Sequence, residues 1–348
     1  MLAKIAAAPI AEYYMQCHSL PAKVCDSIDK MMRDFIWGST EERRRMHMVR
    51  WSTVTLPKEL GGLGLYLMKH RNGAILAKLC WRLAHKEGKP WANMLSAKYL
   101  CSNRVTEEGR NLPYSRIWAA CKKGGPIYVK GLRWTIRNGE SVSMWRDFWL
   151  PSGRLRELIE GPLTRGEEEL TVRQCYDENH VWKPSSISFE LPASVLNTIK
   201  ATPFSFVHQE SDSLMWAYSN NGFFSIQAAY LIARGLNPLN PDTLSFKWVW
   251  KSETLPKIHF LIWLCLQDSL PTAHVLGSRG LSLDPLCKLC NKHNETIEHL
   301  FRSCEVADQF WTQLQVPHCI KNSFTLPFKA WLEVNYNDGM NVYVKGTP

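Results

Sequence analysis

Long apolar runs are missing from this chain of 348 residues, and no stretch of about 18 apolar residues could form a membrane-spanning helix. The N-terminal segment Met1–Tyr14 is also too short for a signal peptide, because Lys4, Pro9 and Glu12 interrupt it. A Gly-x-Ser-x-Gly motif, which marks one large class of hydrolases, does not occur. These absences predict a nuclear or cytoplasmic protein that is neither secreted nor membrane-bound and has no small-molecule substrate.

The eleven cysteines therefore belong in a reducing compartment, where we expect free thiols rather than disulfides. Isolated cysteines are usually small buried hydrophobes. Eight fit this description: Cys17, Cys25, Cys80, Cys101, Cys121, Cys175, Cys265 and Cys319. The remaining three, Cys287, Cys290 and Cys304, lie close together in the sequence.

This cluster has the spacing of a zinc site. Cys287 and Cys290 are separated by two residues, and His299 and Cys304 follow in a His-x4-Cys arrangement. Three thiolates and one imidazole complete a tetrahedral shell, which leaves no position for water and so predicts a structural Zn²⁺. Five residues on a regular helix would turn His299 and Cys304 about 140° apart, so we expect the helix to break or tighten between them.

Three other interpretations of the cluster stay open. The cysteines could be buried thiols beside a surface histidine, or Cys287-x-x-Cys290 could be a redox motif, although no strand–helix pattern of the thioredoxin kind surrounds it. His293 is a competing ligand, but its polar neighbours suggest the tip of a loop.

Positive charge is concentrated in the first half of the chain. Residues 1–150 hold 25 Lys/Arg and 12 Asp/Glu, a net charge of +13, whereas residues 151–348 hold 17 and 20, a net of −3. The asymmetry suggests a polyanionic partner for the first half, most plausibly nucleic acid. A solubilising surface charge would give the same composition.

Periodicity and turn signals predict an α+β fold that is mainly helical with short β-hairpins. Apolar spacing indicates helices over residues 21–37, 70–85, 91–100, 113–122, 225–233, 256–266, 270–280 and 306–314, with Gly124-Gly125 ending the fourth. Turn signals at 137–140 and 220–222 predict hairpins, the first joining strands 132–136 and 141–145, the second joining residues 215–218 to 223–224. Trp134 and Trp145 on the first hairpin are either core residues or stacking surfaces.

Motifs distributed along the chain resemble the reverse transcriptases of plant LINE-type (non-LTR) retrotransposons, and residues 214–311 resemble their zinc-binding domain in particular. The matching motifs there are Trp216, Gly222-Phe223-Phe224-Ser225, Val249-Trp250-Lys251, Pro256-Lys257, Leu270-Pro271-Thr272, the cysteines, Glu295, His299-Leu300-Phe301 and Trp311. Further matches upstream include Phe35-Ile36-Trp37-Gly38, Gly61-Gly62-Leu63-Gly64, Trp81-Arg82, and Gly139 with Trp145, Asp147 and Trp149. The resemblance covers about nine-tenths of the chain.

The resemblance implies five segments. They are a helical region like a polymerase thumb or connection (1–105), a helix with a Trp-rich hairpin (106–160), an irregular linker (161–210), the zinc-binding domain (211–316) and a truncated tail (317–348). The last twelve residues, Asn337–Pro348, do not match the continuation found in the family.

Departures from the family bear on catalysis. A polymerase needs a Tyr-x-Asp-Asp element to hold two Mg²⁺ ions, and the 348 residues contain no Asp-Asp dipeptide. A ribonuclease H domain is not expected either, because about 40 residues follow Cys304. Asp147, Asp212 and Asp268 are isolated, so an enzyme is the least favoured interpretation.

We therefore expect a non-catalytic part of a retroelement protein that binds RNA or DNA, with other retroelement proteins as further partners. Candidate phosphate contacts, which a solvated loop would equally explain, are Arg43, Arg44, Arg45, Lys58, Lys69 and Arg71. A zinc-stapled module that binds protein rather than nucleic acid is the alternative. If the zinc module touches nucleic acid, Lys288, Lys292 and Arg302 would have to supply the attraction.

Overall fold

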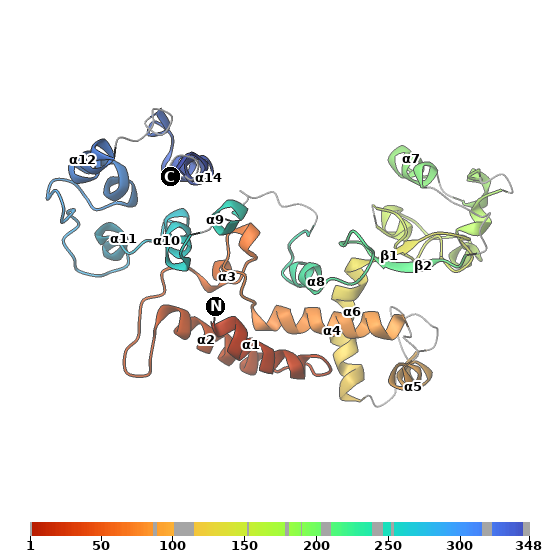
Figure 1. The fold of residues 1–348 in the computed structure, drawn as a ribbon. Helices are drawn as coiled ribbons and strands as arrows, with labels where there is room; N and C mark the ends of the chain where they lie inside the picture. Colours follow the sequence, from red (N-terminus) through yellow and green to blue (C-terminus); the bar gives the residue numbers. More distant parts are fainter. Residues whose placement is uncertain are drawn as a thin grey trace. The chain divides into compact units, whose positions relative to one another are not determined.

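The computed structural model describes residues 2–85, 89–100, 115–151, 153–177, 181–188, 190–202, 210–238, 246–251, 254–314 and 322–343. The chain divides into two compact units, each built from separated segments. Unit 1 comprises residues 1–7, 25–68 and 240–348, and unit 2 comprises residues 8–24 and 69–239. Figure 1 traces their helices and strands. The five segment boundaries expected from the sequence stay a prediction.

Unit 1 is helical, as the apolar periodicity predicts. The segment expected at 21–37 forms α2 (Ala22–Trp37), and Pro256 opens α10 (Pro256–Leu266) from its first position. Further elements include α3 (Trp51–Val54), the 3₁₀ turn η1 (Lys58–Leu60), α9 (Lys247–Lys251), α11 (Ala273–Ser278), α12 (Glu305–Gln313) and α14 (Phe328–Tyr343). Helix α14 occupies half of the segment expected as a truncated tail (317–348).

The core of unit 1 forms where α10 meets the glycine-rich turn after η1. Trp263 of α10 is fully buried, and its Nε1 donates to the Gly61 carbonyl oxygen at 2.8 Å. Gly61 has φ +84°, and a Cβ on Gly62 would lie 2.0 Å from the Leu56 carbonyl oxygen. The two glycines therefore let this turn form, and the turn presents the Gly61 carbonyl oxygen to Trp263. The surrounding buried residues are Met48, Val49, Val54, Leu65, Leu264, Cys265 and Leu270.

Unit 2 contains α4 (Met68–Ala84), which begins at the last residue of unit 1, with α5 (Pro90–Tyr99), α6 (Arg116–Gly131), α7 (Ala193–Ala201) and α8 (Ile226–Ala233). Helix α1 (Leu2–Met15) lies partly in this unit. The expected stop at Gly124-Gly125 is wrong, because α6 continues to Gly131. A Cβ on Gly124 would lie 2.4 Å from the Leu76 carbonyl carbon of α4. Gly124 therefore allows two helix backbones to approach closely and does not end the helix.

The strands pair with each other across about 80 residues of sequence. Strand β1 (Leu132–Thr135) runs antiparallel to β2 (Ser213–Trp216), with Leu132 opposite Trp216 and Thr135 opposite Ser213. The expected hairpin partners, residues 141–145 and 223–224, are not strands; only Ser143 forms an isolated bridge, to Thr171. The first strand of each predicted hairpin exists, as β1 and β2, but the predicted partner that follows each turn signal is wrong. The mainly helical α+β class is confirmed.

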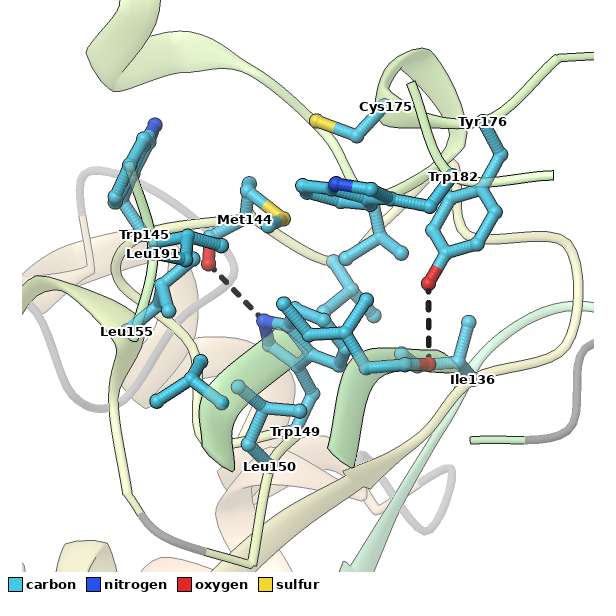
Figure 2. Packing of buried hydrophobic residues seen from close by; sticks show 14 residues of the cluster. Ile136, Met144, Trp145, Trp149, Leu150, Leu155, Cys175, Tyr176, Trp182 and Leu191 are labelled. Carbon is cyan, nitrogen blue, oxygen red and sulfur yellow. Dashed lines mark hydrogen bonds between the residues drawn. The ribbon is translucent and has the colours of Figure 1, made fainter. Parts of the chain in front are cut away.

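Unit 2 also contains a tryptophan-rich core, which is formed by residues that come after β1 in the sequence (Figure 2). Trp145 is fully buried, and Trp149 donates from Nε1 to the Met144 carbonyl oxygen at 3.0 Å. Residues 161–210, expected as a linker, instead supply half of this core: Val172, Cys175, Tyr176, Trp182, Leu191, Val195 and Ile199. Trp145 is thus a core residue and offers no stacking surface, whereas Trp134 is partly buried against the cluster.

Two expectations from composition can be checked on the described residues. Five scattered cysteines, namely Cys25, Cys80, Cys121, Cys175 and Cys265, are buried free thiols, Cys17 is half-buried, and Cys101 and Cys319 lie outside the described residues. In the part of the chain that the structure describes, no helix is both long and apolar enough to cross a membrane.

Candidate metal centre

The first two ligands of the predicted zinc site lie on a tight turn. The backbone N–H of Cys287 donates to the His293 carbonyl oxygen at 2.8 Å, and Asn291 donates to the Cys287 carbonyl oxygen at 2.7 Å. Asn291 has a φ of +54°, in the left-handed region that asparagine tolerates better than most residues. The chain therefore folds back on itself directly after Cys290, and this turn brings both sulfurs to one side.

The other two ligands are brought together by a π turn, η6 (His299–Ser303). Cys304 then leaves the helix in an extended conformation, φ −73° and ψ 135°, and directly precedes α12. The sequence predicted that the helix would break or tighten here. It does break, but the turn widens instead of tightening, because the hydrogen bond spans five residues. This widening solves the spacing problem posed by His-x4-Cys.

All four predicted ligands converge in unit 1. One ligand atom from each of Cys287, Cys290, His299 and Cys304 lies within 4.8 Å of the others. The Cys287 and Cys304 sulfurs are 4.0 Å apart, and Cys290 Sγ is 3.3 Å from His299 Nε2. Zinc–sulfur bonds of about 2.3 Å in a tetrahedron place two sulfurs about 3.8 Å apart. The donor set and its spacing therefore fit Zn²⁺, and among the described residues it is the one such His/Cys/Asp/Glu group found.

The protein surroundings prepare these groups unequally for metal binding. Hydrogen bonds from the backbone N–H groups of Lys292 and His293 lower the pKa of the Cys290 thiol to about 6. Burial raises the pKa of Cys304, although N–H groups at the start of α12 oppose this effect. A metal ion must therefore displace the proton from the fully buried Cys304, whereas Cys290 is already largely a thiolate near neutral pH.

Hydrogen-bond partners near the ligands orient the imidazole ring of His299. Ser303 Oγ lies 3.4 Å from His299 Nδ1, so it can accept the ring proton and leave Nε2 for the metal. The backbone N–H of His299 donates to Thr296 Oγ1 at 3.1 Å. His293, the competing ligand considered above, is exposed and is not part of the four-residue group. The contact of Ser303 with the ring was not predicted from the sequence.

Two further motif residues prove to be structural. Glu295 accepts a hydrogen bond from the Ala273 backbone N–H at 2.9 Å, at the beginning of α11. Trp311 donates from Nε1 to the Phe301 carbonyl oxygen at 2.8 Å, which ties α12 to the π turn. Neither is a metal ligand. Their hydrogen bonds connect the metal turn to the neighbouring helices, a role that spacing alone does not indicate.

The six candidate phosphate contacts lie in both units. Arg43, Arg44 and Arg45 are exposed, on a loop fixed by hydrogen bonds from the Arg43 and Arg45 backbone N–H groups to Thr40 and Ser39. Lys58 is half-buried with Nζ 4.6 Å from the ring centroid of Trp250.

The remaining two candidates belong to unit 2. Lys69 is exposed near the start of α4, and Arg71 donates from Nε to Glu12 at 2.7 Å. Of the six, only the three arginines therefore form a compact exposed group.

The cations beside the metal turn are largely engaged within the protein. Lys292 pairs with Glu305 at 2.7 Å. Arg302 pairs with Glu298 and donates to the carbonyl oxygens of Phe324 and Leu326. Lys288 is exposed. The attraction to nucleic acid that these three residues were expected to supply is therefore reduced to one exposed lysine.

The isolated aspartates have structural partners. Asp147 Oδ2 accepts from the Ser143 backbone N–H at 2.7 Å, and Asp268 pairs with Lys329 at 2.6 Å. Asp212 accepts from three backbone N–H groups, at 2.7 to 3.0 Å, in the loop that follows β1. Each carboxylate is thus occupied in holding a loop or an ion pair.

Comparison with known proteins agrees with the geometry. Residues 224–311 match the family described as zinc-binding in reverse transcriptase. An Arabidopsis thaliana protein named "Putative ribonuclease H protein" is 26% identical over 327 residues, which are 92% of this chain and 52% of that protein. The chain thus spans about half the length of this relative. An uncharacterized mitochondrial protein of Arabidopsis thaliana is 29% identical over 139 residues, 40% of this chain and 90% of that protein. No solved structure matches.

The matched region begins at Phe224 and ends at Trp311, so it encloses all four residues of the metal-binding group. The resemblance drawn from the sequence motifs is therefore confirmed: the chain carries, in residues 224–311, a zinc-binding region of the kind found in reverse transcriptases.

Proposed function

We propose that this chain is the zinc-binding part of a plant LINE-type retrotransposon reverse transcriptase, that it binds RNA or DNA of the element, and that it performs no catalysis itself. The observation that carries the proposal is the convergence of Cys287, Cys290, His299 and Cys304 within the matched region. We assign these four residues as the ligands of one Zn²⁺.

The zinc ion has a structural role in this proposal. Three thiolates and one imidazole fill the four positions that zinc prefers, so no water or substrate is bound. The ligands come from two separate turns, and α12 begins at the fourth ligand. Binding the ion therefore stabilises both turns and the start of α12, and its binding energy contributes to folding.

The proposed absence of catalysis is argued from the positions and partners of the carboxylates. Polymerase and nuclease chemistry requires acidic side chains that converge on Mg²⁺. Asp147, Asp212 and Asp268 each hold backbone N–H groups or a lysine instead, and no described group of three or more acidic residues is positioned to hold a metal. The ribonuclease H activity in the relative's name is thus not proposed for this chain.

Nucleic-acid binding rests on the charge distribution. Residues 1–150 have a net charge of +13, from 25 Lys/Arg and 12 Asp/Glu, and the exposed arginines 43–45 belong to this half. Contacts of this kind bind phosphate without reading sequence and weaken steeply with salt.

A protein-binding module is the second candidate. Val306, Phe310 and Leu314 recur every four residues along and just beyond α12, and their side chains are 43%, 55% and 48% exposed. Such an apolar stripe on a helix suits a protein partner better than a phosphate backbone. Under this alternative the same zinc ion holds the helix that carries the docking face.

A salt titration separates the two candidates. We expect the zinc-loaded chain to bind single-stranded RNA or DNA at low salt, with log affinity falling linearly as log salt concentration rises. Replacing Arg43, Arg44 and Arg45 by Gln together should reduce the slope if this loop contacts phosphates. A wild-type chain with no affinity for RNA or DNA at low salt would reject the nucleic-acid proposal and leave the protein-binding candidate.

A further inference from the structure

We propose that a basic groove along one face of α4 in unit 2 binds the backbone of a single-stranded nucleic acid, with one base stacked on Phe223. The inference rests on the nucleic-acid binding proposed above. It assigns that binding to residues other than the exposed arginine loop at 43–45, and it adds an aromatic contact that phosphate attraction alone does not require.

Two adjoining hollows make up the groove. One lies against α1 and α4 and is lined by Glu12, Arg71, Lys78 and Arg82 among others. The other is lined by Lys78, Trp81, Arg82, Lys89, Phe223 and Phe224. Because Lys78 and Arg82 line both hollows, the two form one continuous depression along the helix.

The cations of the groove follow one face of α4. Arg71, Lys78 and Arg82 are spaced by seven and four residues, which places them on the same side of a helix. Lys89, at the start of α5, also lines the second hollow. Glu12 is the one acidic residue among the described residues that line the groove, and its carboxylate pairs with Arg71. Lys78, Arg82 and Lys89 are the other charged side chains among the described lining residues, so the described lining is predominantly basic.

The length of the row suits a short single strand. Eleven residues separate Arg71 from Arg82, a rise of about 16 Å along the helix. Phosphates of one strand are about 3.4 Å apart along a stacked helix, so this face spans roughly five nucleotides. The span lies within the site sizes of known single-strand-binding grooves, about 4–16 nucleotides.

Phe223 supplies an aromatic face beside these cations. Its side chain is 69% exposed, whereas the neighbouring Phe224 packs on Trp216, with ring centroids 4.4 Å apart. The Phe223 backbone is held on both sides: its N–H donates to Asn221 Oδ1 at 3.1 Å, and its carbonyl oxygen accepts from Ser219 Oγ at 2.6 Å. These hydrogen bonds fix the backbone from which the ring projects, so the turn does not have to be ordered when a base binds.

The combination of an exposed aromatic ring with neighbouring cations indicates which kind of ligand the groove binds. One exposed phenylalanine by itself would be ordinary surface. Next to three cations in a groove, it matches the way in which proteins bind unpaired strands, with bases on aromatic rings and phosphates on Lys or Arg. A duplex hides its base faces, and a protein partner would be expected to cover a larger apolar area than this single ring. The groove therefore fits single-stranded nucleic acid.

Fluorescence anisotropy with oligo(U) and oligo(dT) of about 12 nucleotides, and with a duplex of similar length, tests the inference on the full zinc-loaded chain. We expect Phe223→Ala to weaken single-strand binding about 5- to 150-fold without changing the salt slope, because stacking contributes about 1–3 kcal/mol per base. Phe223→Trp should restore affinity. Lys78→Gln should reduce the salt slope by about 0.7, the value for one lost phosphate contact.

Matched variants control for surface changes elsewhere. Phe310→Ala removes an exposed aromatic ring from α12 of unit 1, and Lys200→Gln removes an exposed lysine from α7 of unit 2. Both should bind like the wild type. Comparison of oligo(U) with oligo(dT) then tells RNA from DNA as the preferred strand.

Two failures are distinguishable. If the wild type binds no oligonucleotide at low salt, the proposed function and this inference fail together. If the wild type binds and Phe223→Ala and Lys78→Gln bind equally well, with unchanged salt slopes, the groove is not the site and only this inference is overturned. Duplex binding as tight as single-strand binding and equally insensitive to Phe223→Ala would also overturn it.

Discussion

The backbone N–H of Cys304 donates to the carbonyl oxygen of His299 at 2.9 Å, and this hydrogen bond closes the π turn that joins the last two candidate zinc ligands. A regular helix would leave the two side chains on different faces, because successive residues turn by about 100°. The wider turn, followed by the extended backbone of Cys304, brings the imidazole and the thiol to one point. The His-x4-Cys spacing is therefore compatible with a closed tetrahedral site.

Loss of a ligand should release the metal. We expect about one zinc per native chain and clearly less than one in Cys290→Ser, together with a lower unfolding temperature of unit 1, because zinc binding energy contributes to folding. Metal content by mass spectrometry and thermal unfolding with and without a chelator measure both effects. Cys17→Ser, which changes a half-buried thiol outside the cluster, is the matched control and should retain zinc. A native chain without metal would contradict the assignment.

The sequence predicted the metal centre better than the surrounding contacts. Ligand spacing depends on residue types a few positions apart, so Cys287, Cys290, His299 and Cys304 could be found by counting. The widened turn between His299 and Cys304 follows from the metal geometry and could be expected only as an interruption of the helix.

Local sequence signals could not predict the pairing of strands that lie far apart in the chain. Most apolar periodicities gave a helix at the expected place, because a helix is built from neighbours three and four residues apart. Strand β1 instead pairs with β2, which lies about 80 residues later, and turn signals such as Asn138-Gly139 report only the local chain. Which strand covers which edge depends on the tertiary core, and no periodicity within residues 132–145 could reveal it.

The two adjacent glycines of α6 should respond oppositely to alanine. Gly124 contacts the α4 backbone, so the added methyl group of Gly124→Ala has no room and should destabilise unit 2 by about 1–3 kcal/mol. Nothing lies within 4 Å of a Cβ on Gly125, so Gly125→Ala should stabilise the helix by about 0.5–1 kcal/mol. Urea unfolding of the two variants measures the difference. Equal effects would show that α6 does not approach α4 as described.

Asp212 should matter for stability and not for any reaction. Asp212→Ala removes the acceptor of the backbone N–H groups of Arg137, Gly139 and Ser141, which should cost about 1–3 kcal/mol of unfolding free energy. Asp308→Ala, at an exposed position of α12, should change stability far less. Denaturant unfolding of both variants is the measurement. An Asp212→Ala protein as stable as the wild type would show that the loop after β1 does not depend on this carboxylate.

Asp29 should make unit 1 less stable as the pH rises. Asp29 is 6% exposed, its carboxylate accepts from the Met68 backbone N–H at 3.1 Å, and burial raises its pKa to about 6, from an ordinary value near 3.8. The folded state thus binds the proton more tightly than the unfolded chain. Its stabilising effect is complete below about pH 4 and is lost as the pH rises to about 6.

Comparing two proteins at each pH isolates this effect, because acid also releases zinc from thiolates and imidazole. Asp29→Asn removes the titrating group and keeps an oxygen for Met68. We expect its stability relative to the wild type to increase between about pH 4 and pH 6 and then level off, by at most about 3 kcal/mol. A difference between Asp29→Asn and the wild type that stays constant from pH 4 to 7 would show that Asp29 titrates normally in the folded protein.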